Sequence, residues 1–114
     1  MTSTGALVLA GGGHSHALLL KRWAMRPQHR PDRRIVLVNR LGSALYSGMV
    51  PALIAGLEQQ KNVEIDLRQL CDRAGAAFVQ AEICGVDLGR QLLQLSNRPA
   101  LHYPLLSLDV GAVS

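Results

Sequence analysis

Three consecutive glycines, two histidines and a serine form the segment of this sequence best suited to binding chemistry, Gly11-Gly12-Gly13-His14-Ser15-His16. Gly11 and Gly13 match the first two glycines of a dinucleotide-binding fingerprint, and His16 stands where the third glycine would be. Gly11 permits a tight turn, and Gly13 lets the backbone approach a pyrophosphate. The amides near Gly13, His14 and Ser15 would face the anion at the start of a helix. The pattern predicts a phosphate-binding loop.

The alternative for this segment is a glycine turn that only reverses the chain. Three consecutive glycines exceed what a turn needs, so we favour the phosphate-binding loop. We expect His14 to act as a backbone donor rather than a catalyst, and His16 to be packed or solvent-facing. His29 and His102 are isolated in the sequence, so no metal-ligand spacing is visible.

The elements around the loop are the ones that a dinucleotide site requires. Residues 5–10 form a short apolar run that is typical of a strand buried on both faces. Residues 14–26 lack helix breakers until Pro27 and predict a helix. Residues 34–39 predict a second buried strand. Together they predict a βαβ unit with parallel strands.

The end of the second predicted strand is where a dinucleotide fold places an acid that holds the ribose hydroxyls. This sequence has Asn39 and Arg40 there. Asn39 can bond a hydroxyl without the strength of a charged acceptor. Arg40 beside a 2′-phosphate would indicate NADP, and beside an adenine it could stack on the ring.

The pattern of predicted elements changes after the middle of the chain. We predict in turn a loop over 40–47, a short helix over 48–57, a helix over 66–75, a strand over 77–81, a hairpin of 82–88 with 91–95, a turn with one more short strand over 96–104, and a strand over 105–110. The helix over 66–75 has the strongest markers, since Asp66 and Gln69 have capping-box spacing and Gly75 suits its end.

The composition restricts the function classes. The chain has 114 residues, 48% hydrophobic and 4% aromatic, which is enough for one domain with an aliphatic core. So few aromatic residues count against a stacking surface for single-stranded nucleic acid. The net charge is +4, with +5 in residues 1–60 and −1 in residues 61–114. That excess fits an anionic partner or, alternatively, a solvated basic helix end and loop.

The two cysteines and the apolar runs indicate the compartment. Cys71 and Cys84 form no CxxC motif, and we expect both to be structural thiols. The uncharged stretch at the start of the chain lacks a basic n-region and is interrupted by glycines, so it does not predict a signal peptide. The uncharged stretch over 41–57 is too short and too broken to span a membrane. We expect a cytoplasmic protein.

The order of elements resembles that of the FAD-binding domain of the glutathione-reductase type, in which a β-meander replaces the second crossover helix. The resemblance rests on LVLAGGGHSHALLLKR, YSGMVPALIAG, IDLRQLCDRAGAAFVQAEICGVDL and YPLLSLDVGA. The chain is similar to the N-terminal segment of FAD-dependent pyridine-nucleotide oxidoreductases. It resembles more closely the NADH-dehydrogenase-like flavoprotein module associated with selenide, water dikinase in some bacteria.

The resemblance implies an α/β Rossmann-like FAD/NAD(P)-binding fold, with residues 1–114 as one partial domain. The NAD(P)H domain and the rest of the flavin site would lie outside these residues. It also implies that the FAD contacts are at Gly11, Gly13, His14, Ser15, Asn39, Arg40, Gly48, Met49, Ile83 and Gly111. Compared with the family pattern, Asn39 replaces an acid and Asp109-Val110 replaces Ala-Thr. These two departures affect the expected affinity for FAD and not the expected fold.

The resemblance implies an NAD(P)H-dependent flavin oxidoreductase that passes electrons through FAD to a quinone or another acceptor. No redox cysteine pair follows the second predicted strand, and the residues suggest no catalytic set and no metal site. The alternatives are a non-catalytic nucleotide-binding module and an NADP-binding Rossmann domain. We expect FAD as ligand, a homodimer through residues 46–57 or an open sheet edge, and a selenide, water dikinase domain as a further partner.

Overall fold

A parallel sheet is the centre of the computed structural model, which describes residues 5–46 and 63–109. In this part of the chain four parallel strands pair in the order β5-β2-β1-β9. Their bounds are β1 (Leu7–Ala10), β2 (Ile35–Asn39), β5 (Ala77–Gln80) and β9 (Leu105–Leu108). The two central strands are almost completely buried because their apolar side chains are covered on both faces. This confirms the predicted buried strands and the βαβ unit.

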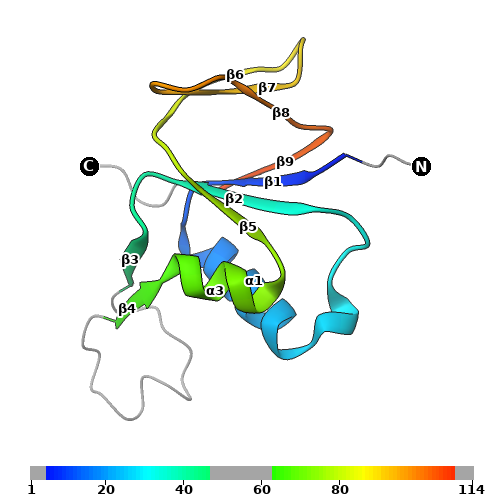
Figure 1. The fold of residues 1–114 in the computed structure, drawn as a ribbon, viewed down its shortest axis with the longest axis vertical. Coiled ribbons are helices and arrows are strands. Elements are labelled where there is room, and N and C mark those ends of the chain that lie inside the picture. Colours follow the sequence, from blue (N-terminus) through cyan, green and yellow to red (C-terminus); the bar gives the residue numbers. More distant parts are fainter. Residues whose placement is uncertain (1–4, 47–62, 110–114) are drawn as a thin grey trace.

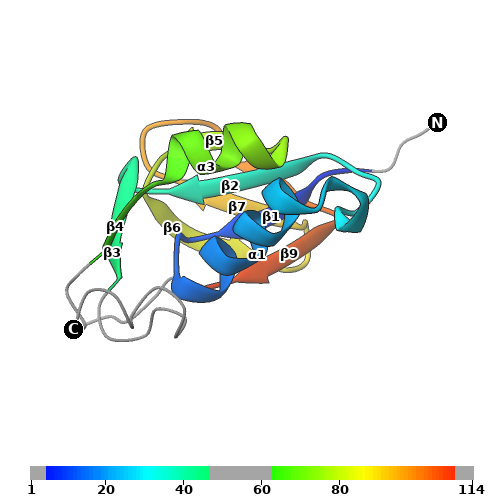
Figure 2. The same cartoon turned by 90° about the horizontal axis from the view of Figure 1, so that it is seen from below.

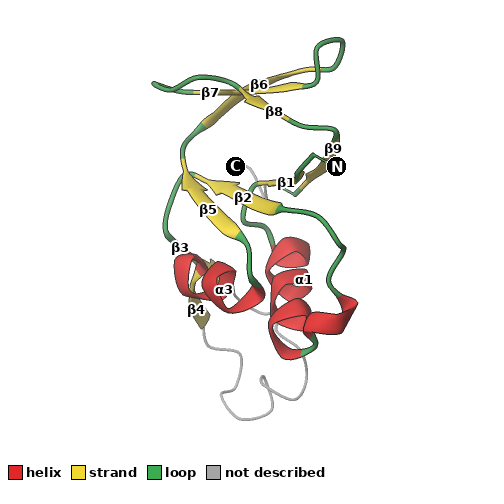
Figure 3. Ribbon diagram, turned by 45° about the vertical axis from the view of Figure 1, so that its right-hand side comes forward, coloured by secondary structure: helices red, strands yellow, loops and turns green. Residues whose placement is uncertain are grey.

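Two layers cover this sheet on opposite faces (Figure 1). One consists of the helices α1 (His14–Met25) and α3 (Leu67–Ala74), with the short 3₁₀ helix η1 (Pro27–His29) after α1. The other is a meander of β6 (Ile83–Asp87), β7 (Leu92–Leu95) and β8 (Leu101–His102). Figure 3 shows the helices and the meander separated by the sheet. The order confirms the predicted α/β fold with an attached β-meander.

Each face of the sheet has its own apolar core. Val8, Val36 and Val38 face the meander and pack with Leu93 and Tyr103. The alternate side chains along the same strands face the helices, because successive residues of a strand point to opposite faces. On that side the core consists of Leu9, Leu20, Trp23, Ile35, Leu37, Leu67, Cys71 and Ala74.

Helix α3 begins and ends where its capping residues predict. The carboxylate of Asp66 accepts a hydrogen bond of 3.1 Å from the amide of Gln69, which satisfies a free donor of the first turn. Gly75 follows the helix with φ of 75°, a left-handed conformation that glycine adopts without a steric penalty. These contacts confirm the helix predicted over 66–75.

The loop predicted over 40–47 is wrong in part. Residues Ser43–Tyr46 form β3, which pairs antiparallel with β4 (Val63–Asp66) in a separate ribbon. Figure 2 shows this ribbon beside the end of β2. The prediction failed because the pairing partner lies about 20 residues along the chain, and an isolated four-residue run carries little strand pattern. The helix predicted over 48–57 lies outside the described residues.

Strand β9 lies at the edge of the sheet, beside β1. Leu105 and Leu108 on this strand are 47% and 61% exposed. Such an edge presents main-chain groups and apolar side chains to a further strand. Within residues 5–46 and 63–109, no further strand pairs with β9, and this is the sheet edge through which self-association is expected.

Candidate functional site

The candidate site lies where the carboxyl ends of β1, β2 and β9 meet. From β1 the chain continues through α1 to β2 on one side, whereas β9 returns to the other side of β1. Ligands of open α/β sheets bind at such a reversal of strand order, outside the carboxyl ends of the strands. The glycine loop leaves β1 at this point and enters α1.

Gly11 makes the turn out of β1. Its φ is 96°, a value that residues with a side chain rarely adopt. Its amide donates to the carbonyl of Val38 on β2 at 2.7 Å. The predicted role of Gly11 in a tight turn is confirmed.

Asn39 holds this glycine loop from the end of β2. Its Oδ1 accepts a hydrogen bond of 2.9 Å from the amide of Gly12, and its Nδ2 donates to the carbonyl of Leu41 at 2.9 Å. The sequence predicts only one role for Asn39, a contact with the ribose. In the structure both ends of its side-chain amide bond to the main chain, so Asn39 positions the glycine loop.

Arg40 follows with an exposed side chain. Its carbonyl accepts a hydrogen bond of 3.2 Å from Nε2 of Gln80 at the end of β5. Oε1 of Gln80 in turn accepts a hydrogen bond from the guanidinium of Arg68. The Cζ atom of that guanidinium lies 5.1 Å from the centre of the Phe78 ring. The corner after β2 is therefore anchored to β5 and α3, and the charged end of Arg40 is accessible.

Asp109, the first residue after β9, reaches the start of α1. Its main-chain oxygen accepts from the amide of Gly13 at 2.9 Å, and its own amide donates to the carbonyl of Ala10 at 2.9 Å. Its Oδ2 accepts from the amide of His16 at 3.1 Å. The resemblance matches Asp109-Val110-Gly111 to the family's closing segment near the pyrophosphate, with Asp109-Val110 in place of Ala-Thr. The strand predicted over 105–110 ends earlier, at Leu108, which places the Asp109 carboxylate at the loop after β1.

His16 lies beneath the loop and is only 2% exposed. Its Nδ1 is 2.8 Å from the carbonyl oxygen of Gly11, and its Nε2 is 2.8 Å from Oγ of Ser107 on β9. Because a carbonyl can only accept, we assign the hydrogen to Nδ1 in the neutral ring, and the Ser107 hydroxyl then donates to Nε2. Of the two expectations for His16, packed or solvent-facing, the structure shows the packed one.

The other predicted site residues divide into described and undescribed positions. His14 is the first residue of α1, and Ser15 follows it with an exposed side chain. Ile83 begins β6, directly after the segment that leaves the carboxyl end of β5. Gly48, Met49 and Gly111 lie outside the described residues. The structure thus brings Gly11, Gly13, His14, Ser15 and Asn39 together around one loop.

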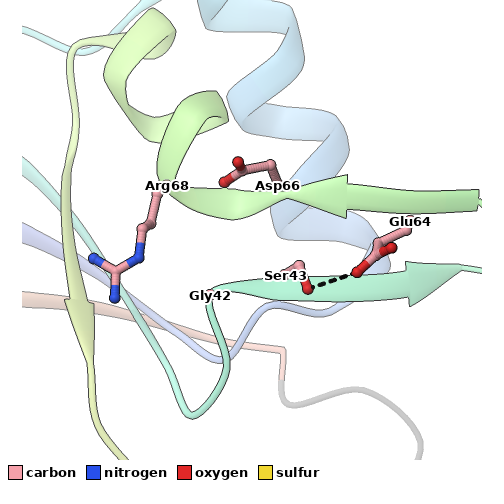
Figure 4. A pocket seen from close by; sticks show the side chains of 5 residues that line it. All are labelled: Gly42, Ser43, Glu64, Asp66 and Arg68. Carbon is pink, nitrogen blue, oxygen red and sulfur yellow. Dashed lines mark hydrogen bonds between the residues drawn. The ribbon is translucent and has the colours of Figure 1, made fainter.

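A surface hollow lies beside the corner after β2. It is lined by Gly42, Ser43, Glu64, Asp66 and Arg68 (Figure 4). Ser43 donates to Glu64 at 3.0 Å, and the Asp66 carboxylate caps α3. Leu67, which follows Asp66, lies close to the glycine loop, because a side chain placed at Gly12 would be 2.8 Å from it. The hollow itself offers a hydroxyl, two carboxylates and a guanidinium.

The two cysteines differ in their surroundings. Cys71 lies in the core beneath α3, and burial raises the pKa of its thiol to about 12. Such a thiol is almost entirely protonated at neutral pH, which agrees with the predicted structural role. Cys84 is exposed. Among the described residues no group of three or more His, Cys, Asp or Glu side chains could hold a metal ion.

Among the helices of the described residues, none is both long and apolar enough to cross a bilayer.

Comparison with known proteins supports the fold. The chain superposes on the sulfide:quinone oxidoreductase from the hyperthermophilic bacterium Aquifex aeolicus with a TM-score of 0.65 and 17% sequence identity. The match covers 92% of this chain and 24% of that chain, so the present sequence spans about a quarter of its structural neighbour. No family model matches the sequence, and no curated protein matches it. At this identity the likeness shows a shared FAD/NAD(P)-binding type of α/β fold.

Proposed function

We propose that this chain is the part of a flavin-dependent oxidoreductase that binds the pyrophosphate and adenosine of FAD. The observation that carries the proposal is the Gly11–Gly13 loop, which leaves β1 at the reversal of strand order and opens α1. In this position the first amides of α1 point toward an anion, and the helix dipole favours negative charge. The Ser15 amide has no main-chain partner within the described residues, so it is free to donate to a phosphate.

The residues present agree with a pyrophosphate in all but one respect. Gly11 makes the required turn, Asn39 fixes the loop, and Gly13 has no side chain of its own. The Asp109 carboxylate, however, lies over Gly13. A dinucleotide and this carboxylate cannot share that space, so the fit requires the Asp109 side chain to turn away.

The meander distinguishes FAD from a nicotinamide cofactor in this proposal. Ile83 begins β6 directly after the segment that leaves the carboxyl end of β5, and its main chain would pair with the adenine edge. The Arg40 side chain and the hollow beside Gly42 would flank the adenosine. When bound, FAD would supply electron transfer, and this chain would hold and orient it. Gly48, Met49 and Gly111 complete the proposed contact set.

The wider activity that we propose is electron transfer to a quinone. The structural neighbour is a sulfide:quinone oxidoreductase, which supports a quinone as the electron acceptor. NAD(P)H as donor and a selenide, water dikinase domain as partner rest on the sequence resemblance alone. Because the chain spans a quarter of its neighbour, we expect the nicotinamide site to be formed by residues beyond these 114.

A titration of the purified chain tests the proposal. FAD, ADP and FMN are each added, and binding is followed by calorimetry with flavin fluorescence as a second signal. We expect FAD and ADP to bind, and FMN to bind at least tenfold more weakly, because it lacks the adenosine and the pyrophosphate bridge. Equal affinities for FMN and FAD would contradict the assignment of the glycine loop as the pyrophosphate site.

NADP⁺ and NAD⁺ are included to decide the nearest alternative. The exposed Arg40 could bind a 2′-phosphate, so tight binding of NADP⁺ without FAD would assign the chain to an NADP-binding domain. Arg40→Ala would then abolish the preference for NADP⁺ over NAD⁺. Under the FAD proposal the same variant weakens FAD and ADP together.

A further inference from the structure

We infer that Asp109 acts as an internal competitor for the pyrophosphate position, so that its carboxylate must leave before a dinucleotide binds. This inference rests on the proposed function and concerns the same loop. It makes Asp109 a determinant of affinity that the sequence pattern of the glycine loop does not include.

The first observation is the set of amides that Asp109 already occupies. Its Oδ2 accepts from the amide of His16, 93 residues earlier in the chain, and its main-chain oxygen accepts from the amide of Gly13. Helix α1 has no acid in its own first turn, and Gly13 at the N-cap provides no side-chain cap. Asp109 therefore supplies the negative charge that the start of this helix favours.

The second observation is the space above Gly13. A Cβ built on Gly13 would collide with the Asp109 carboxylate, and it would lie 2.7 Å from the main-chain oxygen of Asp109. The absence of a side chain at Gly13 is the feature that would admit a phosphate. The carboxylate fills the volume that this glycine leaves open, and its charge repels a second anion.

The backbone around Asp109 can stay in place while the site is cleared. The Asp109 amide bonds to Ala10, and its carbonyl bonds to Gly13, so the end of β9 is anchored on both sides. The carboxylate itself accepts the hydrogen bond from His16. A rotation about the side-chain bonds of Asp109 would release the His16 amide and clear the space above Gly13 without moving the backbone.

The test removes the charge and keeps the shape. Asp109→Asn retains the size of the side chain, and Asp109→Ser retains a short polar cap, so two variants guard against a loss of folding. Asp32→Asn is the matched control, because it makes the same charge change in an exposed loop at the opposite end of β2. Inorganic pyrophosphate and FAD are titrated into the full chain at constant ionic strength, with circular dichroism confirming the fold.

We expect Asp109→Asn and Asp109→Ser to bind pyrophosphate roughly tenfold more tightly than the parent chain, whereas Asp32→Asn changes by less than about twofold. Equal or weaker pyrophosphate binding by both Asp109 variants would overturn the inference. An unchanged FAD affinity in the two Asp109 variants would also overturn the inference, while it would still agree with the proposed function. A gain for pyrophosphate without any FAD binding would support the competition and refute FAD as the ligand. Failure of every protein to bind either compound would refute both.

Discussion

His16 and Ser107 are 91 residues apart in the sequence, yet Nε2 of the imidazole lies 2.8 Å from the serine hydroxyl oxygen. The other ring nitrogen bonds to the carbonyl of Gly11 at 2.8 Å. One buried side chain therefore ties the glycine loop, the first helix and the edge strand β9 together. Buried polar groups of this kind are costly to leave unpaired, which makes the pair a determinant of the site's rigidity.

Replacement of His16 tests this link. We expect His16→Ala to lower the free energy of unfolding by about 3 kcal/mol, because it leaves a cavity and removes the partner of the buried Gly11 carbonyl. Urea denaturation measures the change. His29→Ala is the control, since His29 is exposed in η1. Equal stability of the two variants would show that the His16 contacts contribute nothing.

We expect substitutions of Gly11 and Gly13 to destabilise the loop for different reasons. Gly11→Ala strains the backbone, because φ is 96°, and should cost about 1–3 kcal/mol. At Gly13 the φ of −70° is ordinary, but a Cβ would lie 2.7 Å from the main-chain oxygen of Asp109. Gly13→Ala should therefore displace the end of β9 and weaken FAD binding together.

Gly89→Ala is the control for both glycine variants. Its nearest contact would be an ordinary 3.6 Å from Asp87 Oδ1, so we expect a change below about 0.5 kcal/mol. Thermal unfolding and FAD titration of the three variants measure both effects. Parent-like stability of Gly13→Ala would mean that β9 does not restrict this position.

Substitution of Asn39 distinguishes loop positioning from contact with a ribose. Asn39→Ala removes the acceptor of the Gly12 amide and the donor to Leu41, and we expect a loss of about 1–2 kcal/mol. Asn39→Asp keeps an acceptor for Gly12 but places a carboxylate beside the Leu41 carbonyl. If the side chain also holds the ribose, Asn39→Asp should bind FAD more tightly than the parent chain, because a charged acceptor strengthens the hydrogen bond to a hydroxyl. An FAD affinity of Asn39→Asp no higher than that of the parent would restrict Asn39 to positioning.

Stability at alkaline pH reports on Cys71. Burial raises the pKa of its thiol to about 12 in the folded chain, whereas an unfolded thiol has an ordinary pKa near 9. The neutral thiol therefore stabilises the fold fully below pH 9, and this contribution is lost as the pH rises from about 9 toward 12. We expect Cys71→Ala to be less stable at pH 7 and to show a shallower decline above pH 9. Parallel curves for the two proteins would contradict the burial of the thiol.

Self-association is expected through the free edge of β9. Light scattering at micromolar concentration should detect a dimer, and Leu105→Lys with Leu108→Lys should convert it to a monomer, because charges on an edge strand oppose further pairing. Leu88→Lys is the control, since Leu88 is 78% exposed in the meander turn. A dimer that survives the double substitution would indicate the other surface that the sequence predicts, residues 46–57, of which 47–57 lie outside the described residues.

The sequence by itself determined the elements whose formation depends on neighbouring residues. The apolar runs of β1 and β2 predict buried strands because strands covered on both faces need few polar side chains. Asp66 and Gly75 mark the ends of α3 because capping uses contacts within a few residues. Gly11 marks the turn because its conformation is a local requirement. These features together identified the α/β fold and the loop.

Only the tertiary structure decided which distant residues meet at that loop. The pairing of β3 with β4, the contact of Asn39 with Gly12, and the approach of Asp109 and Ser107 to the start of α1 all depend on which strands lie side by side. A hydrogen bond across 93 residues leaves no periodic pattern in the sequence, because its geometry is set by the order β5-β2-β1-β9. The placement of β9 beside β1 is therefore what brings the Asp109 carboxylate to the start of α1.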